Sequence, residues 1–360
     1  MRIGFDATPL SAPYSGVGTY AANLLHALQM KSQEEIVTLA PLSTNGNRHR
    51  PVSNKTLWMQ LTLPRDISYL DLDICHFTNF VAPLLCPCPT VITIHDMTLW
   101  MFPELHPTRR LAAMRPIIPL AAQHASAIIA VSKSAKADIV SILDLDPDKV
   151  HVVYEAPAEH FQPINDEEYL TRIRARYHLS DPFILYVGTL EPRKNIVRLL
   201  EAFAELCHSG TVPHHFVIIG NRGWKDSPIF EAVERLKIGK FIRFIGQIPA
   251  EDLAALYNLA EAFVFPSLYE GFGLPVIEAM ACGAPVVTST RGSLQEIADD
   301  AAEFIDPTDI QSIKQGLLRV LCDPGYAHEL SQRGLQRAAQ FRWSDAADQT
   351  RWIYRNVLGC

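Results

Sequence analysis

A series of short apolar segments constrains the fold most, because it runs through the first half of the chain and then starts again. These segments are rich in β-branched and aromatic residues, as buried strands are, and longer stretches with helical spacing separate them. Alternation of this kind predicts βαβ units with a mostly parallel sheet. Because the series restarts at Phe183–Val187, we expect the 360 residues to form two doubly wound α/β domains.

The expected strands form two series. The first is Arg2–Asp6, Ile36–Leu39, Ile74–Phe77, Val91–His95, Ala127–Val131 and Val150–Tyr154, and the second is Phe183–Val187, Phe216–Ile219, Arg243–Ile245, Ala262–Phe265, Pro285–Thr288 and Glu303–Ile305. Helices are expected over Val17–Leu28, from a cap at Ser132 to Ser141, over Asn195–Cys207, and through 324–358 with a weak point near Phe341–Trp343.

The polar, proline-bearing segment Pro157–Asp166 is interpreted as the linker between the two series. We therefore expect an N-terminal domain over 1–165, a second domain over 166–342 and a final helix over 343–360. In open α/β sheets, ligands bind outside the carboxyl ends of the strands. The loops that follow strands are consequently the expected places for chemistry.

Charge and hydropathy exclude several classes of protein. The formal net charge is −7 and neither half is basic, which argues against a nucleic-acid partner. No apolar stretch reaches the roughly 18 residues of a membrane span, and the first residues are too polar for a secretory signal, so we expect a cytoplasmic protein. The seven cysteines include no C-x-x-C pair. We expect reduced thiols, with a metal or disulfide site as the alternative.

Two loops of the first half carry residues suited to a ligand. Gly16 and Gly18 stand between the first strand and its helix, where glycine lets the backbone approach an anion at the helix N-terminus. The third glycine of the dinucleotide fingerprint is missing, so a plain tight turn is the alternative and a nicotinamide site is disfavoured. His95 ends a buried strand, and the alternative there is a hydrogen-bonded structural histidine.

The first strand of the second series is followed by Gly188, which allows a tight turn, and by the pair Arg193 and Lys194. These two cations stand beside the start of the next helix, which Asn195 can cap. Fixed positive charge and free N–H groups converge in such a place, which suits a diphosphate. The alternative is a solvated basic pair.

The most informative motif follows the strand that ends at Phe265. Glu270 lies in a glycine-flanked loop, Pro275 suits the first turn of a helix, and Glu278 comes about one turn later. The N–H groups of the loop and of the helix start can meet an anion, and carboxylates accept hydrogen bonds from sugar hydroxyls. The glycine setting therefore favours a site for an anion and sugar hydroxyls over two unrelated surface charges.

The pair Glu270 and Glu278, with Gly271-Phe272-Gly273 between them, resembles the E-x7-E signature of the retaining glycosyltransferases of group 1 (family 4). Further segments resemble motifs of that family in the same order, namely Gly16-Val17-Gly18, His95-Asp96, Gly188 with Arg193-Lys194-Asn195, Gly292-Ser293-Leu294-Gln295-Glu296-Ile297 and Asp306-Pro307. The resemblance covers nearly the whole chain and is most specific in the second half.

The resemblance implies the GT-B fold, in which two Rossmann-like domains face each other across a cleft and the C-terminal helix crosses back to the first domain. It implies that Glu278 binds the donor ribose, that Glu270 contacts the donor sugar, and that the nucleobase lies along Gly246–Ile248. The implied donor-binding residues are Gly16, Gly18, Gly188, Gly246, Gln247, Ile248, Gly271, Phe272, Gly273, Leu274 and Glu278, and the implied catalytic residues are Glu270, His95, Arg193 and Lys194.

The implied reaction breaks the bond between the sugar C1 and the diphosphate, and an acceptor hydroxyl attacks the resulting oxocarbenium-like sugar with retention of configuration. Cations and N–H groups would stabilise the charge that grows on the diphosphate. Either front-face attack or a covalent intermediate is compatible with this pattern. No cofactor is expected beyond the sugar-nucleotide co-substrate. No metal is expected either, because this arrangement requires none and no Asp-x-Asp motif stands among the segments that resemble the family.

The segment from His95 to Pro107 resembles bacterial mannosyltransferases of polysaccharide assembly such as those of lipopolysaccharide, which implies GDP-mannose as donor and UDP- or dTDP-hexoses as the alternatives. The implied acceptor is a saccharide or a lipid-linked saccharide. Two other functions remain as alternatives, a sugar-nucleotide epimerase or phosphorylase on the same architecture and a non-catalytic sugar-binding subunit.

A lipid-linked acceptor would bring the protein to the inner face of the plasma membrane without spanning it. The candidate contact is Trp100–Leu120, where Trp100, Met101 and Phe102 stand in an expected loop and Arg109, Arg110 and Arg115 follow. Aromatic side chains favour the membrane interface, and arginines favour anionic headgroups. The alternative is a helix of the core with a solvated basic edge.

Overall fold

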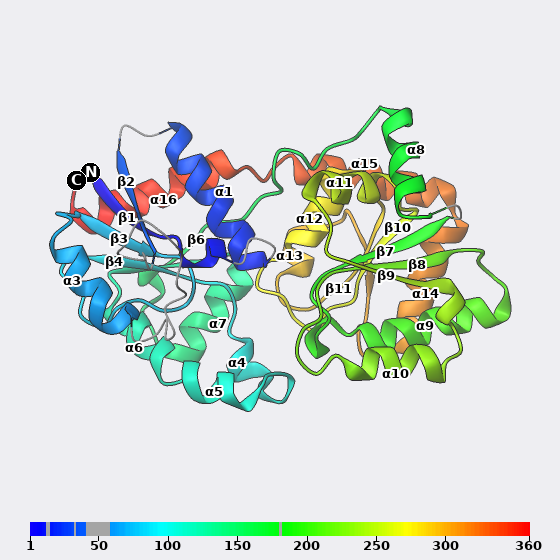
Figure 1. The fold of residues 1–360 in the computed structure, drawn as a ribbon, viewed down its shortest axis with the longest axis horizontal. Helices are drawn as coiled ribbons and strands as arrows, with labels where there is room; N and C mark the ends of the chain where they lie inside the picture. Colours follow the sequence, from blue (N-terminus) through cyan, green and yellow to red (C-terminus); the bar gives the residue numbers. More distant parts are fainter. Residues whose placement is uncertain (12–14, 32–33, 41–57, 180–181) are drawn as a thin grey trace, which may run out of the picture. The chain divides into compact units, whose positions relative to one another are not determined.

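The computed structural model describes residues 1–11, 15–31, 34–40, 58–179 and 182–360 and contains two compact units. Unit 1 comprises Met1–Glu155 and Arg342–Cys360, and unit 2 comprises Ala156–Phe341. Each unit has its own parallel six-stranded sheet with helices around it (Figure 1). The expectation of two α/β domains, each with a parallel sheet, is therefore confirmed.

The sheet of unit 1 has the strand order β2-β1-β3-β4-β5-β6. Its strands are β1 (Arg2–Asp6), β2 (Glu35–Leu39), β3 (Ile74–Phe77), β4 (Thr90–Ile94), β5 (Ala127–Ala130) and β6 (Val150–Val152). Its helices are α1 (Gly16–Lys31), α3 (Leu63–Ser68), α4 (Thr98–Met101), α5 (Thr108–Met114), α6 (Ile117–His124), α7 (Lys133–Leu143) and α16 (Trp343–Leu358). The strand order reverses between β1 and β3, so the loops after these two strands flank the switch point of the sheet.

The sheet of unit 2 has the strand order β12-β11-β10-β7-β8-β9. Its strands are β7 (Phe183–Val187), β8 (His215–Ile219), β9 (Ile242–Gly246), β10 (Ala262–Phe265), β11 (Val286–Ser289) and β12 (Glu303–Ile305). Its helices are α8 (Glu167–Arg176), α9 (Ile196–Ser209), α10 (Ser227–Arg235), α11 (Ala250–Leu259), α12 (Leu274–Ala281), α13 (Leu294–Ala298), α14 (Ile310–Cys322) and α15 (Pro324–Ala338). This is the Rossmann strand order, with its switch point between β7 and β10.

Every predicted strand is present, with ends that differ by at most two residues. The buried core explains this agreement, since β3, β4, β5, β7, β10 and β11 are buried along their whole length. Ser132 caps α7 as predicted, because its hydroxyl accepts a hydrogen bond from the Ala135 N–H at 2.9 Å. The predicted weak point near 341–343 separates α15 from α16.

Residues 157–165, which we expected to close the first domain, lie with unit 2. The Ile164 N–H donates to the Asn258 side chain at 2.8 Å, and the Phe161 ring lies edge-on to Tyr257 at 5.8 Å. These contacts tie the expected linker to α11. The two units accordingly divide at Glu155–Ala156.

Helix α16 packs on α1 within unit 1, and the two lie side by side in Figure 1. The buried Tyr354 hydroxyl is 2.6 Å from His76 Nδ1, and His76 Nε2 is 2.8 Å from the Thr93 hydroxyl. Burial and the neighbouring His95 lower the pKa of His76 to about 3, so its ring is neutral. A neutral imidazole has one donor and one acceptor nitrogen, and both are used here.

We expect Tyr354→Phe to reduce the free energy of unfolding by about 1–3 kcal/mol, because it leaves a buried His76 nitrogen without its partner. Urea denaturation checks this expectation. The matched control is Tyr69→Phe, whose side chain is 76% exposed and which should change stability little. Equal stability of Tyr354→Phe and the wild type would contradict the role of this hydrogen bond.

The start of the Trp100–Leu120 segment is helical, whereas a loop was expected there. Trp100 and Met101 belong to the short helix α4 and not to a loop, and α5 and α6 follow. Arg115 donates through Nε and Nη2 to the Leu99 carbonyl at 3.0 and 2.7 Å, and its guanidinium lies 5.8 Å from the Trp100 ring centre. Arg115 thus contacts the backbone of unit 1. The side chains of Arg109 and Arg110 lie at the surface.

No helix in the described part of the chain combines the length and the apolar character needed to cross a bilayer.

Candidate active site

The switch point of unit 2 brings two loops together, the one after β7 and the one after β10. The first contains Gly188 and the turn Pro192–Lys194, and the second contains Glu270. The Leu268 N–H donates to the Arg193 carbonyl at 2.9 Å, which fixes the loops to each other. The two motifs singled out in the second half therefore form one site.

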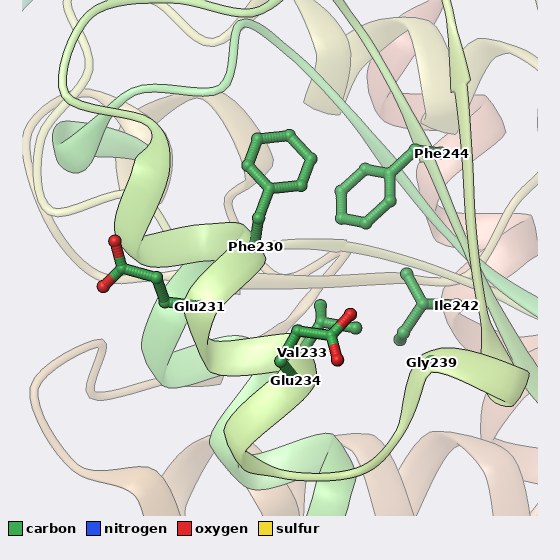
Figure 2. A pocket seen from close by; sticks show the side chains of 7 residues that line it. All are labelled: Phe230, Glu231, Val233, Glu234, Gly239, Ile242 and Phe244. Carbon is green, nitrogen blue, oxygen red and sulfur yellow. The ribbon is translucent and has the colours of Figure 1, made fainter.

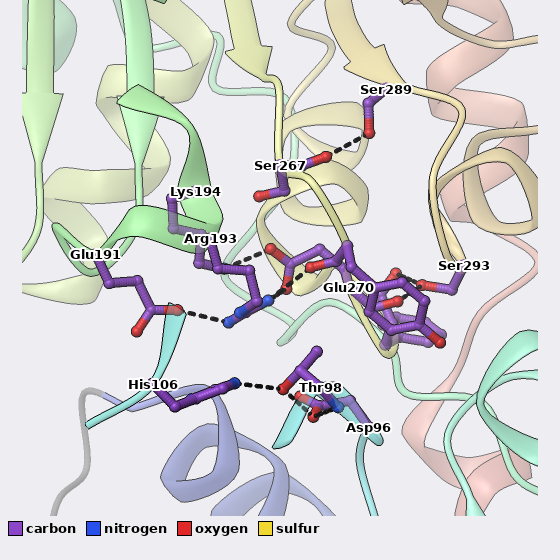
Figure 3. Close-up of polar contacts among 12 residues, drawn as sticks. Asp96, Thr98, His106, Glu191, Arg193, Lys194, Ser267, Glu270, Ser289 and Ser293 are labelled. Carbon is purple, nitrogen blue, oxygen red and sulfur yellow. Dashed lines mark hydrogen bonds and ion pairs between the residues drawn. The ribbon is translucent and has the colours of Figure 1, made fainter. Parts of the chain in front are cut away.

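Glu270 is held by both predicted cations. Lys194 Nζ lies 2.7 Å from Glu270 Oε1, and Arg193 Nη1 lies 2.7 Å from Glu270 Oε2 (Figure 3). Arg193 Nη1 also donates to the Tyr269 carbonyl at 2.7 Å. All three side chains are at most 14% exposed. The alternative of a solvated basic pair is thus excluded.

Glu191 is a fourth member of this cluster that the sequence analysis did not single out. Its Oε1 lies 2.8 Å from Arg193 Nη2, and its side chain is 4% exposed. Two carboxylates and two cations leave the cluster formally neutral. A doubly charged ligand would therefore have to share the cations with these carboxylates.

The electrostatics of the cluster follow from its burial. Burial alone would raise the pKa of Glu270, but the charges of Arg193 and Lys194 outweigh it and lower that pKa to about 2. Burial lowers the pKa of Lys194, and the attraction of Glu270 opposes this effect. The Lys194 ammonium also lies 4.8 Å from the centre of the Phe265 ring, where the aromatic face attracts a cation.

The loop that carries Glu270 is held from α13. The Ser293 hydroxyl donates to the Phe272 carbonyl at 2.6 Å and to the Glu270 carbonyl at 3.1 Å, and the Ser293 N–H also bonds the latter. Gly292 has φ +63°, and a Cβ there would lie 2.5 Å from the Glu270 carbonyl oxygen. The Gly292-Ser293 motif therefore fixes the backbone of the Glu270 loop.

Asn195 does not cap α9 with its side chain, contrary to the prediction. It adopts a left-handed conformation with φ 60°, and its Nδ2 donates to the Pro266 carbonyl at 3.2 Å and to the Pro307 carbonyl at 2.6 Å. Asn195 thereby links the loop after β7 to those after β10 and β12. This contact places the Asp306-Pro307 motif beside the site.

Glu278 lies on α12, which begins at Leu274 and has Pro275 in its first turn as predicted. The Glu278 carboxylate is buried and accepts a hydrogen bond from the Tyr257 hydroxyl at 3.2 Å. Gly273 precedes the helix with φ +106°. Residues 271–274 thus form the turn into α12, and Phe272 and Leu274 are buried there.

The loops after β7, β8 and β9 are joined at the same sheet edge. The Gly188 N–H donates to the Ile219 carbonyl, and the Gly220 N–H donates to the Gly246 carbonyl, both at 2.9 Å. Gly246 ends β9, Gln247 accepts a hydrogen bond from Asn221 at 3.0 Å, and Ile248 is buried. The Gly246–Ile248 segment therefore belongs to the carboxyl edge of the sheet. The same edge carries the group of Glu191, Arg193, Lys194 and Glu270, called the ion cluster from here on.

In unit 1, His95 lies just beyond the end of β4 and not within the strand. Its Nε2 is 3.0 Å from the Thr78 carbonyl oxygen, and its Nδ1 is 3.3 Å from Glu155 Oε1. The Tyr20 ring lies edge-on to it at 4.8 Å. Both ring nitrogens thus contact protein acceptors.

The remaining candidates of unit 1 lie at the start of α1 and after β4. Gly16 and Gly18 stand in the first turn of α1, and the Gly18 N–H donates to the Ser15 hydroxyl at 3.0 Å, as at a capped N-terminus. Residues 12–14 of the preceding loop lie outside the described residues.

Asp96 accepts hydrogen bonds from the Thr98 N–H and hydroxyl, and the Thr98 hydroxyl is 3.1 Å from His106 Nε2 (Figure 3).

A hollow of about 690 Å³ lies between α10 and β9 of unit 2 (Figure 2). Its lining is Phe230, Glu231, Val233, Glu234, Gly239, Ile242 and Phe244. Ile242 is the first residue of β9, so the hollow extends to the amino edge of the sheet and does not include the ion cluster.

Two family models match the chain. The model for glycosyl transferases group 1 matches residues 172–337, and the model for glycosyltransferase family 4 matches residues 14–156. The first match spans the ion cluster and Glu278, and the second spans Gly16, Gly18 and His95. The chain belongs to the group 1 glycosyltransferases and is therefore a sugar-transferring enzyme.

Relatives with functional names support this assignment. The chain is 32% identical to the O-antigen chain mannosyltransferase B of Escherichia coli over 99% of its length and 100% of that protein. It is 33% identical to the serotype-specific mannosyltransferase WbdA of Escherichia coli over 72% of its length, which spans about a third (32%) of that longer protein.

Solved structures share the fold. Sucrose-phosphate synthase from Thermosynechococcus elongatus aligns with a TM-score of 0.77 at 22% identity and covers 100% of this chain and 99% of that one. The glycosyltransferase WaaG, involved in lipopolysaccharide biosynthesis, aligns with a TM-score of 0.75 at 15% identity over 98% of this chain and 99% of that one. The GT-B fold class is thereby confirmed.

Proposed function

We propose that the chain is a retaining mannosyltransferase that uses GDP-mannose. The observation that carries this proposal is the 32% identity, over essentially the whole chain, to a relative named as an O-antigen chain mannosyltransferase. The ion cluster at the switch point of unit 2 supplies the groups that such a reaction needs.

In the proposed reaction the bond between mannose C1 and the β-phosphate oxygen breaks, and the electron pair stays on the leaving GDP. Arg193 and Lys194 stabilise the charge that grows on the diphosphate, because they are fixed in a buried place before the reaction starts. Since both cations pair with Glu270 in the described structure, the donor phosphates share them with this carboxylate. The remaining lone pairs of the Glu270 carboxylate accept hydrogen bonds from the sugar hydroxyls.

The acceptor is proposed to be a saccharide hydroxyl, free or lipid-linked, which forms the new bond to C1 and passes its proton to the leaving diphosphate. Glu278 is proposed to bind the ribose hydroxyls and Gly246–Ile248 to contact the guanine. His95, Gly16 and Gly18 are proposed to meet the donor from unit 1. Neither a metal ion nor a further cofactor is part of this proposal, in which Arg193 and Lys194 contact the leaving group.

A thermal-shift panel of GDP, UDP and dTDP tests the donor. GDP at about 100 times its Kd should stabilise the protein by about 2.7 kcal/mol, whereas UDP and dTDP should shift the Tm little. UDP belongs in the panel because the structurally similar Anabaena HepE was solved with UDP and glucose. A shift with UDP or dTDP and none with GDP would overturn the proposed donor.

We further propose that unit 1 contacts an anionic membrane surface peripherally through the Trp100–Leu120 segment, because a lipid-linked acceptor would reside there. Met101 and Leu120 are exposed apolar side chains in this segment, and Arg109 and Arg110 are exposed cations. An arginine near an anionic surface contributes about 1 kcal/mol. The proposed contact is therefore weak and sensitive to salt.

Arg109→Glu/Arg110→Glu should abolish flotation with anionic liposomes at low salt, because the substitution reverses two exposed charges. High salt should abolish flotation of the wild type as well. Arg172→Glu, an exposed arginine of α8 in unit 2, is the matched control and should float like the wild type. Equal flotation of the double variant and the wild type would exclude this segment.

A further inference from the structure

Three cysteine sulfurs of unit 1 meet outside the site described above. Cys75 lies on β3 and is buried, whereas Cys86 and Cys88 are half-buried residues of the loop before β4. The Cys88 sulfur is 3.4 Å from that of Cys75 and 3.9 Å from that of Cys86. All three sulfurs lie within 4.8 Å of one another. We propose that these cysteines form a binding site for one thiophilic divalent cation of the Zn²⁺ class.

The spacing of the sulfurs fits such an ion. Zinc–thiolate bonds of about 2.3 Å in a tetrahedral arrangement separate the sulfurs by about 3.8 Å. The two closest sulfur pairs lie on either side of this value. A disulfide would use only two of the three cysteines, whereas a cation uses them all. Within the described residues, no fourth histidine, cysteine or carboxylate joins the group, so the fourth ligand of the ion would be water.

The surrounding backbone holds the three cysteines in this arrangement. Pro87 and Pro89 alternate with Cys86 and Cys88 and fix the φ angles of the loop. The Cys75 N–H donates to the Pro89 carbonyl at 3.0 Å, which joins the loop to β3. Gly4 lies opposite Cys75 on the adjacent strand β1. A Cβ at Gly4 would lie 2.8 Å from the Cys75 sulfur, so the glycine leaves room for the thiol.

The position of the cluster indicates a structural role. Cys86 and Cys88 precede β4, whereas His95 follows it, so the cluster and His95 lie at opposite ends of the same strand. At about 3.3 Å per residue, the five residues of β4 separate these ends by about 16 Å. A bound cation would therefore fasten the loop that leads into β4 and would not touch the sugar donor.

Titration of the reduced protein with Cd²⁺ tests the proposal. The thiolate-to-metal charge-transfer absorption should rise linearly and saturate at one equivalent per chain. Cys86→Ser/Cys88→Ser should lose at least nine-tenths of this absorption. Cys207→Ser/Cys322→Ser, which removes two cysteines outside the cluster, should keep it. No saturation at one equivalent, or an unchanged signal in the first variant, would overturn the proposal.

A second measurement needs no variant and so does not depend on whether one folds. One equivalent of Zn²⁺ should slow alkylation of Cys86 and Cys88 by iodoacetamide at least tenfold, as read by peptide mass spectrometry. Alkylation of the exposed Cys322 and Cys360 should stay unchanged. Equal protection of all four cysteines, or protection of none, would contradict a site at the cluster.

Discussion

Lys194→Ala should lower kcat by about 10²–10³, which is the typical effect of removing one group that stabilises a developing anion. The Lys194 ammonium is buried at the switch point of unit 2, and Glu270 holds it in place at 2.7 Å. Water reaches this buried position poorly and can therefore compensate little for the lost positive charge. Steady-state measurement of nucleotide release from the sugar donor checks this expectation.

Lys314→Ala is the matched control for Lys194→Ala. Lys314 also pairs with a glutamate, Glu205, at 2.9 Å, but this pair is far more exposed. Solvent screens a partly exposed pair, so the control should keep the kcat of the wild type and change its Tm little. A Lys194→Ala protein with wild-type kcat would refute the phosphate role of this lysine.

Glu270→Ala should destabilise unit 2 and abolish turnover, and added pyrophosphate should restore much of the lost stability. Without Glu270, the buried Lys194 loses its carboxylate partner, and such a loss typically costs about 3–5 kcal/mol. If the cations form the diphosphate site, an anion can replace the missing carboxylate. The Tm of the variant should therefore rise with pyrophosphate by more than that of the wild type.

The control for this anion rescue is Glu205→Ala, which removes the carboxylate from the partly exposed pair with Lys314. Pyrophosphate should change its Tm no more than it changes that of the wild type. An equal response of Glu270→Ala and Glu205→Ala to pyrophosphate would mean that Arg193 and Lys194 do not bind the diphosphate. Turnover at the wild-type level in Glu270→Ala would contradict its proposed contact with the sugar.

The strands and the order of the motifs could be predicted from the sequence, because both depend on local patterns. Buried parallel strands such as β7 and β10 are continuous apolar runs, and the turn into α12 carries its own glycine and proline signals. The two strand series in turn predict that Arg193, Lys194 and Glu270 lie at the carboxyl ends of strands.

Contacts between distant segments could not be predicted in this way. Asparagine is a residue type that often caps helices. The Asn195 side chain instead donates hydrogen bonds to the Pro266 and Pro307 carbonyls, which keep it away from the cap position. Glu191 gave no signal of its own, because its role depends on the direction in which the Arg193 guanidinium points. Arg115 looked free in the sequence because its partner is a backbone carbonyl, that of Leu99.

The cysteine cluster illustrates the same limit. Cys75 is separated in sequence from Cys86 and Cys88, and no metal-binding spacing connects them. The parallel pairing of β3 with β4, which sets Cys75 opposite Thr90, brings the three sulfurs together. Spacing alone therefore predicts reduced thiols, whereas the sheet register places the three sulfurs where one cation could bind them.

The most direct test of the proposed function is NMR analysis of the product formed from GDP-mannose and a mannoside acceptor with a lipid-like aglycone. GDP-mannose carries its sugar in the α configuration. The one-bond C1–H1 coupling of the new residue should therefore show an α-mannoside, formed with release of one GDP per linkage. A β-mannoside would contradict retention, and transfer from UDP- or dTDP-hexoses without transfer from GDP-mannose would contradict the proposed donor.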